Sequence, residues 1–237
     1  MTGHVTVLAG EPEYDSQDSM RAVAARFADH LNVNVDYRTP SILADEPDFR
    51  ESSFGDLSRL EETDLLVVYT RFRRLPEEEM TALAGYLKTG RGVLGLRTSS
   101  HAFHFAEDSP WFEWNDGFGR DVLGSPWSSH HGHGSSTDVS VLPDAPPELV
   151  AGVPSTFHVR SWLYRTQLQA WCRPILWGDP VDPESPPTPG PVAWYGKPEG
   201  RRTFYTSLGH AEDLITEPVQ RLLTNAAGWI LAAGERT

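Results

Sequence analysis

The chain has 237 residues, a length that one α/β domain can occupy, and its hydrophobic share of 39% is enough to fill a core and far from that of a disordered chain. Its 33 acidic against 20 basic residues give a formal net charge of −13, which disfavours nucleic acid or an anionic membrane as a general partner, because phosphates would repel the protein. Cys172 is the only cysteine, which excludes an internal disulfide and a zinc site built from several thiolates.

Strand and helix signals alternate through the first hundred residues. Runs of apolar, often β-branched residues predict buried parallel strands over 4–8, 33–37, 64–69 and 92–96. Helical spacing predicts a helix over 20–31 with Asp18 or Ser19 as its N-cap, and a single helical turn over 58–62. A further helix runs from Pro76 to Lys88, where a proline and three glutamates favour its positive end, and Gly90 stops it.

The second half of the chain is less regular. Its pattern predicts a short helix over 117–123, a loop rich in His, Gly and Ser over 125–136, strands over 137–142, 192–195 and 202–207, and a further strand within 156–167. Six prolines in 179–191 indicate a surface loop. A closing helix follows over 218–232. Together these elements predict one α/β domain over residues 1–237, a doubly wound, mostly parallel sheet flanked by helices.

No stretch reaches the roughly 20 apolar residues that cross a membrane, and the first ten residues show no cleavable leader. We therefore expect a cytoplasmic protein without a membrane partner. If the apolar face of the closing helix is exposed, a homo-oligomer is expected, but the sequence does not separate burial in the core from burial at an interface.

The first candidate site follows the strand predicted over 92–96. Ligand sites of open α/β sheets lie beyond the carboxyl ends of the strands, which favours function here. Arg97 offers a fork of donors for a carboxylate, a phosphate or sugar hydroxyls, and Thr98, Ser99 and Ser100 add hydroxyl groups. His101 can act as acid, base or ligand. The alternative is a plain strand-to-helix turn with serine caps. The G-x-S-x-G pattern of a serine hydrolase is absent.

The second candidate is a group of histidines in two loops. His101 and His104 lie in one, and His130, His131 and His133 lie in the other. Imidazoles from such loops can bind a divalent metal such as zinc, and His131 and His133 are the ligands we expect, in a mixed site with carboxylates. No strict zinc spacing is present. The alternative is a polar loop whose histidines are solvated or bonded to the backbone.

The third candidate is T-S-L-G-H-A-E-D over 206–213, directly after a predicted strand. A turn at Gly209 would present the His210 imidazole at the same edge of the sheet as Arg97. Glu212 or Asp213 would orient the imidazole or supply a second carboxylate. The alternative is that both acids merely cap a following helical turn.

Two further residues are placed to contribute to such a site. Arg71 follows the strand predicted over 64–69, although a solvated charge is an equally ordinary explanation. Trp127 flanks the histidine loop and could stack on a sugar ring, although tryptophans more often fill a core.

Five segments in a fixed order resemble one known family. They read G-R-G-V-L-G-L-R-T-S-S-H-A-F over 90–103, D-V-L-G over 121–124 followed by His130-His131, P-V-A-W over 191–194, R-T-F-Y-T-S-L-G-H over 202–210 and L-L-T-N-A-A-G-W over 222–229. The set resembles the ThuA-like (trehalose-utilisation) family of the class I glutamine amidotransferase-like superfamily, over nearly the whole chain. The resemblance implies a flavodoxin-like sheet and a sugar-related small-molecule site bounded by Arg97, Ser99, His101, His131 and His210.

The chain departs from that family pattern in its turns. Amidotransferases carry a catalytic cysteine in the turn that here reads R-T-S over 97–99, so glutaminase activity is not expected. Many ThuA-like members have histidine where Arg97 stands, and an acidic D-E-x-Y segment where this chain reads R-S-W-L-Y over 160–164. His210 fits the L-G-H motif of the family, and His130 or His131 fits its loop histidine.

The sequence leaves more than one function open. The first is an enzyme of carbohydrate metabolism that hydrolyses, eliminates or isomerises a sugar or keto-sugar derivative. Its substrate would be bound by Arg97, Thr98, Arg71, Trp127 and His131, and its chemistry would be done by His210 with Asp213, assisted by Ser99 or His101. This requires His101 and His210 to converge on one pocket. The second is a non-catalytic ligand-binding or assembly module on a degenerate amidotransferase-like fold. A metal-dependent hydrolase is the third.

Overall fold

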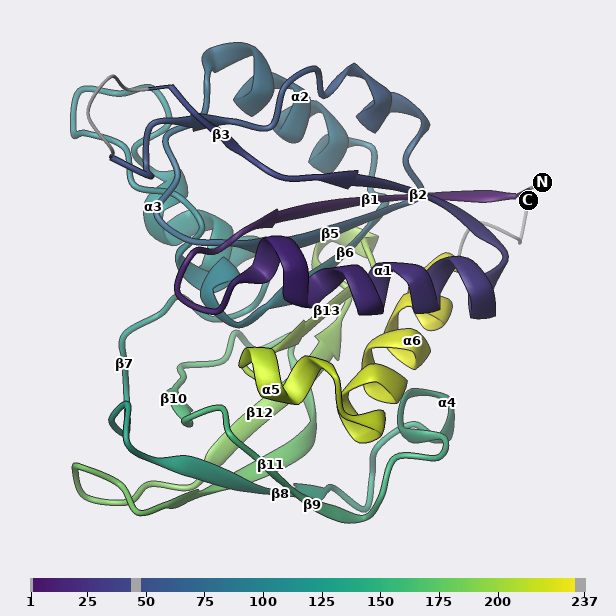
Figure 1. The fold of residues 1–237 in the computed structure, drawn as a ribbon, viewed down its shortest axis with the longest axis vertical. Helices are drawn as coiled ribbons and strands as arrows, with labels where there is room; N and C mark the ends of the chain where they lie inside the picture. The colour runs from purple at the N-terminus through teal and green to yellow at the C-terminus, as the bar shows by residue number, and fades with distance from the viewer. Residues whose placement is uncertain (1, 44–47, 233–237) are drawn as a thin grey trace.

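A nine-stranded sheet forms the centre of the computed structural model, which describes residues 2–43 and 48–232 (Figure 1). The strand order is β2-β1-β5-β6-β13-β12-β11-β8-β9. The first five strands are parallel: β2 (Val33–Arg38), β1 (Gly3–Gly10), β5 (Leu65–Thr70), β6 (Gly92–Leu96) and β13 (Thr203–Thr206). The predicted parallel strands and the doubly wound, flavodoxin-like order are confirmed.

Helices cover both faces of the parallel strands (Figure 1). On one face lie α1 (Ser16–Leu31) and α6 (Glu217–Leu231), and on the other lie α2 (Glu77–Lys88) and the turn η1 (Ser58–Glu62). Side chains alternate along a strand, so Val5 and Val7 of β1 pack in the first core and Leu8 packs in the second. The two apolar layers fix the sheet between the helices.

The second half of the sheet is antiparallel. Each strand runs opposite to its neighbours in β12 (Gly190–Gly196), β11 (Arg173–Val181), β8 (Ser136–Val141) and β9 (Thr156–Val159). β11 was not predicted, because Pro174, Gly178 and Pro180 interrupt its apolar pattern. The loop predicted over 179–191 is therefore shorter, since its first residues complete β11 and Gly190 already belongs to β12.

Shorter elements connect the main ones. Two ladders of two residues per strand pair β3 (Ser41–Ile42) with β4 (Ser52–Ser53) and β7 (Ser129–His130) with β10 (Tyr164–Arg165). The short helical segments are η2 (Arg97–His101), α3 (Trp114–Gly117), η3 (Phe118–Val122), α4 (Pro147–Val150), η4 (Pro198–Gly200) and α5 (Ala211–Leu214). The helix predicted over 117–123 corresponds to the end of α3 and the π-helical turn η3.

The start of α1 differs from the prediction. The helix begins at Ser16, with Asp15 as its N-cap residue in the left-handed conformation, so neither Asp18 nor Ser19 caps it. The Ser16 hydroxyl accepts a hydrogen bond from the backbone N–H of Glu11, at 2.6 Å. This contact ties the first turn of α1 to the end of β1 and sets the position of the loop between them.

The closing helix α6 is a core helix. Its apolar residues are buried against the sheet and α1: Val219, Leu222, Leu223, Ala226, Ala227 and Ile230. The helix therefore offers no exposed apolar face from which a homo-oligomer would follow. None of the helices in the described ranges combines the length and apolarity needed to cross a membrane.

Candidate functional site

The candidate site lies where the parallel strands end. The strand order changes direction at β1, which has β2 on one side and β5 on the other, and open α/β sheets bind ligands outside the carboxyl ends at such a point. The chain leaves these strands at Glu11, Arg71, Arg97 and Ser207. We call the side chains gathered there the strand-end cluster: Tyr14, Arg97, His101, His130, Trp162, Tyr164 and His210.

Arg97 forms the centre of this cluster. Its side chain is fully buried, and its guanidinium carbon lies 4.5 Å, 4.5 Å and 4.8 Å from the ring centres of Tyr14, Trp162 and Tyr164. Three aromatic faces around one cation supply favourable cation–π contacts. The backbone of Arg97 has a φ of 42°, the left-handed region that side chains rarely adopt, so the turn after β6 is strained at this residue.

The hydrogen bonds of Arg97 are directed into the protein. Its Nη1 donates to the carbonyl of Ser207 at 2.8 Å and faces that of Trp162 at 3.5 Å, and its Nη2 donates to the hydroxyl of Tyr14 at 3.1 Å. No carboxylate of the described residues pairs with it, and its buried Nε has no partner there. Arg97 was expected to bind a substrate directly, and the structure places its guanidinium among aromatic rings, with its hydrogen bonds made to protein groups.

The hydroxyls that follow Arg97 are buried as well. Ser99 is 0% and Thr98 is 1% exposed, and neither hydroxyl oxygen has a hydrogen-bond partner among the described residues. Ser99 was expected to assist catalysis, and Thr98 was expected to bind the substrate. Because both side chains are buried, the structure does not support either role.

His101 lies at the edge of the cluster. Its ring centre is 4.9 Å from that of Phe72 and 5.0 Å from that of Trp127, and its Nδ1 lies 3.3 Å from the hydroxyl of Ser100. Burial, with the charges of Arg71 and Arg97, lowers the pKa of His101 to about 3. The imidazole is therefore neutral at physiological pH.

His210 lies on the other side of Arg97. Its ring centre is 5.8 Å from that of Tyr14 and 6.2 Å from that of Trp162. Its Nδ1 accepts a hydrogen bond from the backbone N–H of Glu212, so the imidazole caps the short helix α5. Burial lowers the pKa of His210, and the charge of Arg97 acts in the same direction. His101 and His210 thus meet different rings of one cluster, with no hydrogen bond between them in the described ranges.

Asp213 acts on the backbone of this turn. Its carboxylate accepts hydrogen bonds from the backbone N–H groups of Arg160 and Ser161, at 2.7 Å and 2.9 Å, and from the Ser161 hydroxyl. The same hydroxyl oxygen accepts from the N–H groups of Gly209 and His210, each at 3.0 Å. Asp213 therefore positions His210 through Ser161, and does not bond to the imidazole as the sequence suggested.

The histidine loop separates into a buried and an exposed part. His131 is fully buried, with Nδ1 3.1 Å from the carbonyl of Leu163 and Nε2 accepting from the N–H of Thr188 at 3.1 Å. Both nitrogens are occupied, so neither is available to a metal or a substrate. His133 is exposed. Its ring stacks on His130 and lies tilted against Trp162, with ring centres 4.7 Å apart in each pair. Across residues 2–43 and 48–232, no three His, Cys, Asp or Glu side chains are placed to hold a metal.

Two predicted binding residues border the cluster. The Nε of Arg71 lies 3.0 Å from the buried carboxylate of Glu11, and its Nη1 pairs with Glu13. Trp127 is 36% exposed and presents a ring beside His101. Glu11 was missed by the sequence analysis, although a charged residue directly after a buried strand was a signal that could have found it. Tyr14, Trp162 and Tyr164 carried no such signal.

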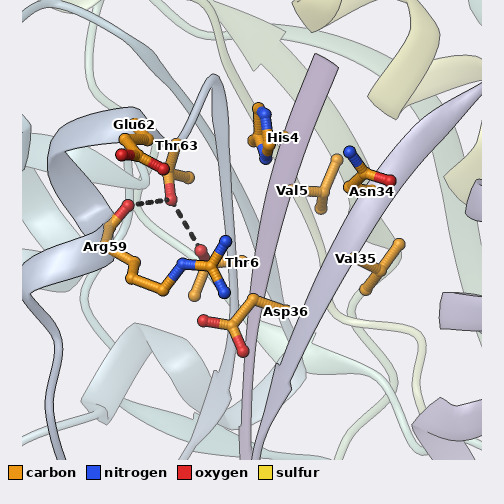
Figure 2. Close-up of a pocket in the computed structure, with 9 residues that line it drawn as sticks. All are labelled: His4, Val5, Thr6, Asn34, Val35, Asp36, Arg59, Glu62 and Thr63. Atoms are coloured by element: carbon orange, nitrogen blue, oxygen red, sulfur yellow. Dashed lines mark hydrogen bonds between the residues drawn. The ribbon is translucent and has the colours of Figure 1, made fainter. Parts of the chain in front are cut away.

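Two hollows among the described residues lie away from the strand-end cluster. One of about 140 Å³ opens toward the amino-terminal half of β1 and β2, between them and η1, and Figure 2 shows the side chains that line it. Its buried hydroxyls, those of Thr6 and Thr63, bond to each other at 2.6 Å. A second, open hollow of about 450 Å³ lies over β8 and β9. Neither contains a residue of the strand-end cluster.

Solved structures of other proteins share this fold. A ThuA-like protein from Parabacteroides merdae has 18% identity and a TM-score of 0.65, with 98% of this chain and 91% of that one covered. A cytoplasmic protein from Salmonella typhimurium has 11% identity and a TM-score of 0.55, with 96% and 98% covered. The carbohydrate deacetylase Agd3 has 13% identity and a TM-score of 0.54, with 98% of this chain and 32% of that one covered. At these identities the likenesses show the fold alone.

Among curated proteins, none matches the chain. The family model described as trehalose utilisation, ThuA, matches residues 4–230. This range contains the whole central sheet except Gly3, the first residue of β1, and all residues of the strand-end cluster. The chain belongs to the ThuA, or trehalose utilisation, family.

Proposed function

We propose that the chain binds a sugar or keto-sugar derivative at the strand-end cluster and acts on it by proton transfer, in an isomerisation or elimination, in the cytoplasm. The observation that supports this proposal is the arrangement of His101, His130 and His210. Three imidazoles from three separate segments lie around one fixed cation at the carboxyl ends of the strands. The family description, trehalose utilisation, agrees with a carbohydrate ligand.

The electrostatics of the cluster suit neutral acid–base chemistry. Burial lowers the pKa of all three histidines, so each imidazole is uncharged near neutral pH and can donate or accept a hydrogen bond. The buried charge of Arg97 is close enough to lower the same three pKa values. Such a fixed cation would stabilise negative charge that develops on a ligand oxygen. The exposed ring of Trp127 would supply an apolar face for a sugar.

Hydrolysis is the least favoured of the expected reactions. Ser99 is fully buried and has no hydrogen-bond partner among the described residues, so it lacks both access to a substrate and a base to activate it. Cys172 is likewise buried and lies outside the cluster. A covalent hydrolytic route therefore has no evident nucleophile here.

One observation favours the second candidate, a ligand-binding module without turnover. The Asp213 carboxylate is engaged by Arg160 and Ser161 and leaves the His210 imidazole without a carboxylate hydrogen bond. The carboxylate of Glu212 lies 3.9 Å from its Nδ1, on a largely exposed side chain. Among residues 2–43 and 48–232, the carboxylate–imidazole pair that activates many catalytic histidines is thus missing.

Ligand-induced thermal stabilisation tests the proposal. A panel of sugars, keto-sugars and sugar acids is titrated against the wild type, His210→Ala and the control His158→Ala, whose histidine is exposed on β9 beside Asp138. A ligand that binds only the folded state raises Tm in a dose-dependent way. We expect a shift in the wild type and the control that is lost or reduced in His210→Ala.

Turnover separates the two candidates. Any ligand that shifts Tm is incubated with the protein in deuterated water, and its exchange or conversion is followed by NMR. Exchange or conversion supports the enzyme, and a shift without either supports the binding module. If no sugar of the panel moves Tm in the well-folded wild type, a carbohydrate function at this site is rejected.

A further inference from the structure

The hydrogen bond at Nδ1 of His210 determines where the imidazole carries its proton. The backbone N–H of Glu212 points at Nδ1 from 3.3 Å. A backbone N–H can only donate, so Nδ1 must be the unprotonated, accepting nitrogen, and a neutral imidazole then has its single hydrogen on Nε2. Nε2 has no hydrogen-bond partner among the described residues, and the side chain is 21% exposed. His210 therefore presents an N–H group, and not a lone pair, to a ligand.

His130 has the same arrangement. The backbone N–H of Gly132 donates to its Nδ1 at 3.0 Å, which also leaves the hydrogen on Nε2. The buried His131 shows the opposite tautomer, because its Nε2 accepts from the N–H of Thr188 and its Nδ1 must therefore donate to the carbonyl of Leu163. The backbone thus selects a tautomer at each of these histidines separately.

His101 has the opposite tautomer to His210. Its Nδ1 faces the hydroxyl of Ser100, whose single hydrogen is directed to the carbonyl of Arg97 at 3.2 Å. The hydroxyl oxygen then accepts from Nδ1–H, and Nε2 of His101 keeps its lone pair. Of the two histidines expected to transfer protons, His101 is the one whose Nε2 has a lone pair, and no described residue donates a hydrogen bond to that nitrogen.

We infer that His210, together with His130, is a neutral hydrogen-bond donor to a carbonyl or carboxylate oxygen of the ligand, and that His101 is a hydrogen-bond acceptor for a ligand hydroxyl. The inference rests on the proposed function for the location of the ligand and adds its class, a keto-sugar or sugar acid. Two N–H groups within the field of a buried Arg97 favour an oxygen with negative charge over a hydroxyl. The same Glu212 N–H disfavours protonation of Nδ1, in agreement with the lowered pKa of His210.

The tautomers are measured on the ligand-free protein by two-dimensional ¹H–¹⁵N NMR of the imidazoles, which separates protonated from unprotonated nitrogens. We expect the hydrogen of His210 on Nε2. Glu212→Pro removes the N–H donor and should yield a mixture of tautomers, while the matched control Glu212→Ala keeps the N–H and the wild-type tautomer. Proline is suited to this position, the second residue of α5, because α6 carries Pro218 at its own second residue. A wild-type His210 with its hydrogen on Nδ1 overturns the inference, even if the proline variant does not fold.

The ligand class is tested with D-gluconate and D-sorbitol, which differ only by a carboxylate in place of a hydroxymethyl group. We expect the wild type to bind gluconate about tenfold more tightly, the preference that one charge-assisted hydrogen bond supplies. In His210→Ala this preference should fall toward one, with little change for sorbitol. Equal binding of both probes to the wild type overturns the ligand class. If neither probe binds, the ligand class is overturned, while the full sugar panel decides the proposed function and the NMR result decides the tautomer independently.

Discussion

At the scale of single residues, Arg97 is the side chain on which the cluster depends most. It fills the space between three aromatic rings and donates hydrogen bonds to the carbonyl of Ser207 and the hydroxyl of Tyr14. Arg97→Ala leaves a cavity and buried polar groups without partners, so we expect the free energy of unfolding to fall by about 3–5 kcal/mol. Urea unfolding measures this loss. Arg173→Ala, which removes an exposed arginine, is the control and should cost less than about 0.5 kcal/mol.

The strained backbone of Arg97 gives this prediction a second part. Alanine at a φ of 42° keeps the strain and glycine relieves it, so Arg97→Gly should be more stable than Arg97→Ala by about 1 kcal/mol, the reverse of the usual order. An Arg97→Ala variant as stable as the wild type would show that the contacts of Arg97 with its three aromatic rings contribute little to the free energy of unfolding. An alanine variant more stable than the glycine one would show that the turn is not strained.

The positions of the site residues were easier to predict than their roles. Arg97, His101 and His210 each follow a strand that apolar patterning reveals, and the rule for parallel sheets placed them at one edge. The burial of Arg97 depends on Trp162 and Tyr164, which are more than sixty residues away in sequence. The role of Asp213 likewise depends on Ser161. No local pattern encodes such distant partners.

At the scale of elements, the contact between η2 and η3 holds His101 in place. A Cβ on Gly119 of η3 would lie 2.1 Å from the carbonyl oxygen of Ser100 and 3.0 Å from Cα of Pro126, both backbone atoms that cannot move alone. We expect Gly119→Ala to push η3 from η2 and to lower the free energy of unfolding by about 2–3 kcal/mol. The His101 imidazole resonances should shift in NMR spectra as the turn moves.

A neighbouring glycine provides the matched control for that substitution. A Cβ on Gly117 would meet nothing closer than 3.7 Å, so Gly117→Ala should be neutral, or stabilising by up to about 1 kcal/mol through better helix propensity. Equal effects of the two alanines would mean that propensity, and not the packing of η3 on η2, determines the result.

Elements were predicted where one pattern dominates. The strands β1, β5 and β6 are continuous apolar runs buried on both faces, which sequence reveals directly. β11 pairs with neighbours on both sides although it contains Pro174 and Pro180. Its register to β12 shifts on either side of Leu176, close to Pro174, and Pro180 lies beyond Gly178, the last residue of β11 that pairs with β12. Such tolerance comes from tertiary pairing, and no local propensity predicts it.

At the scale of the whole molecule, one sheet runs from β2 to β9 through both halves of the chain. The single domain expected over 1–237, the oligomeric state and the cytoplasmic location stay predictions.

The buried imidazoles of this fold make its stability depend on pH. The folded state holds the pKa of His101 at about 3, against an ordinary value of 6.5 in the unfolded chain. Between these values the unfolded chain binds one more proton than the folded protein. The contribution of His101 to the free energy of unfolding is therefore fully present above pH 6.5 and is lost as the pH falls through this window.

Relative to His101→Asn, the wild type should therefore lose about 1.4 kcal/mol of unfolding free energy per pH unit in the acid part of that window. The lowered pKa values of His130 and His210 act in the same direction in both proteins, so the difference between the two isolates His101. Urea unfolding of both, from neutral pH to about pH 4.5, measures this difference. Parallel stability curves would mean that His101 takes up its proton as readily in the folded protein as in the unfolded chain. Burial would then not lower the pKa of His101, and the pH dependence expected here would have to be abandoned.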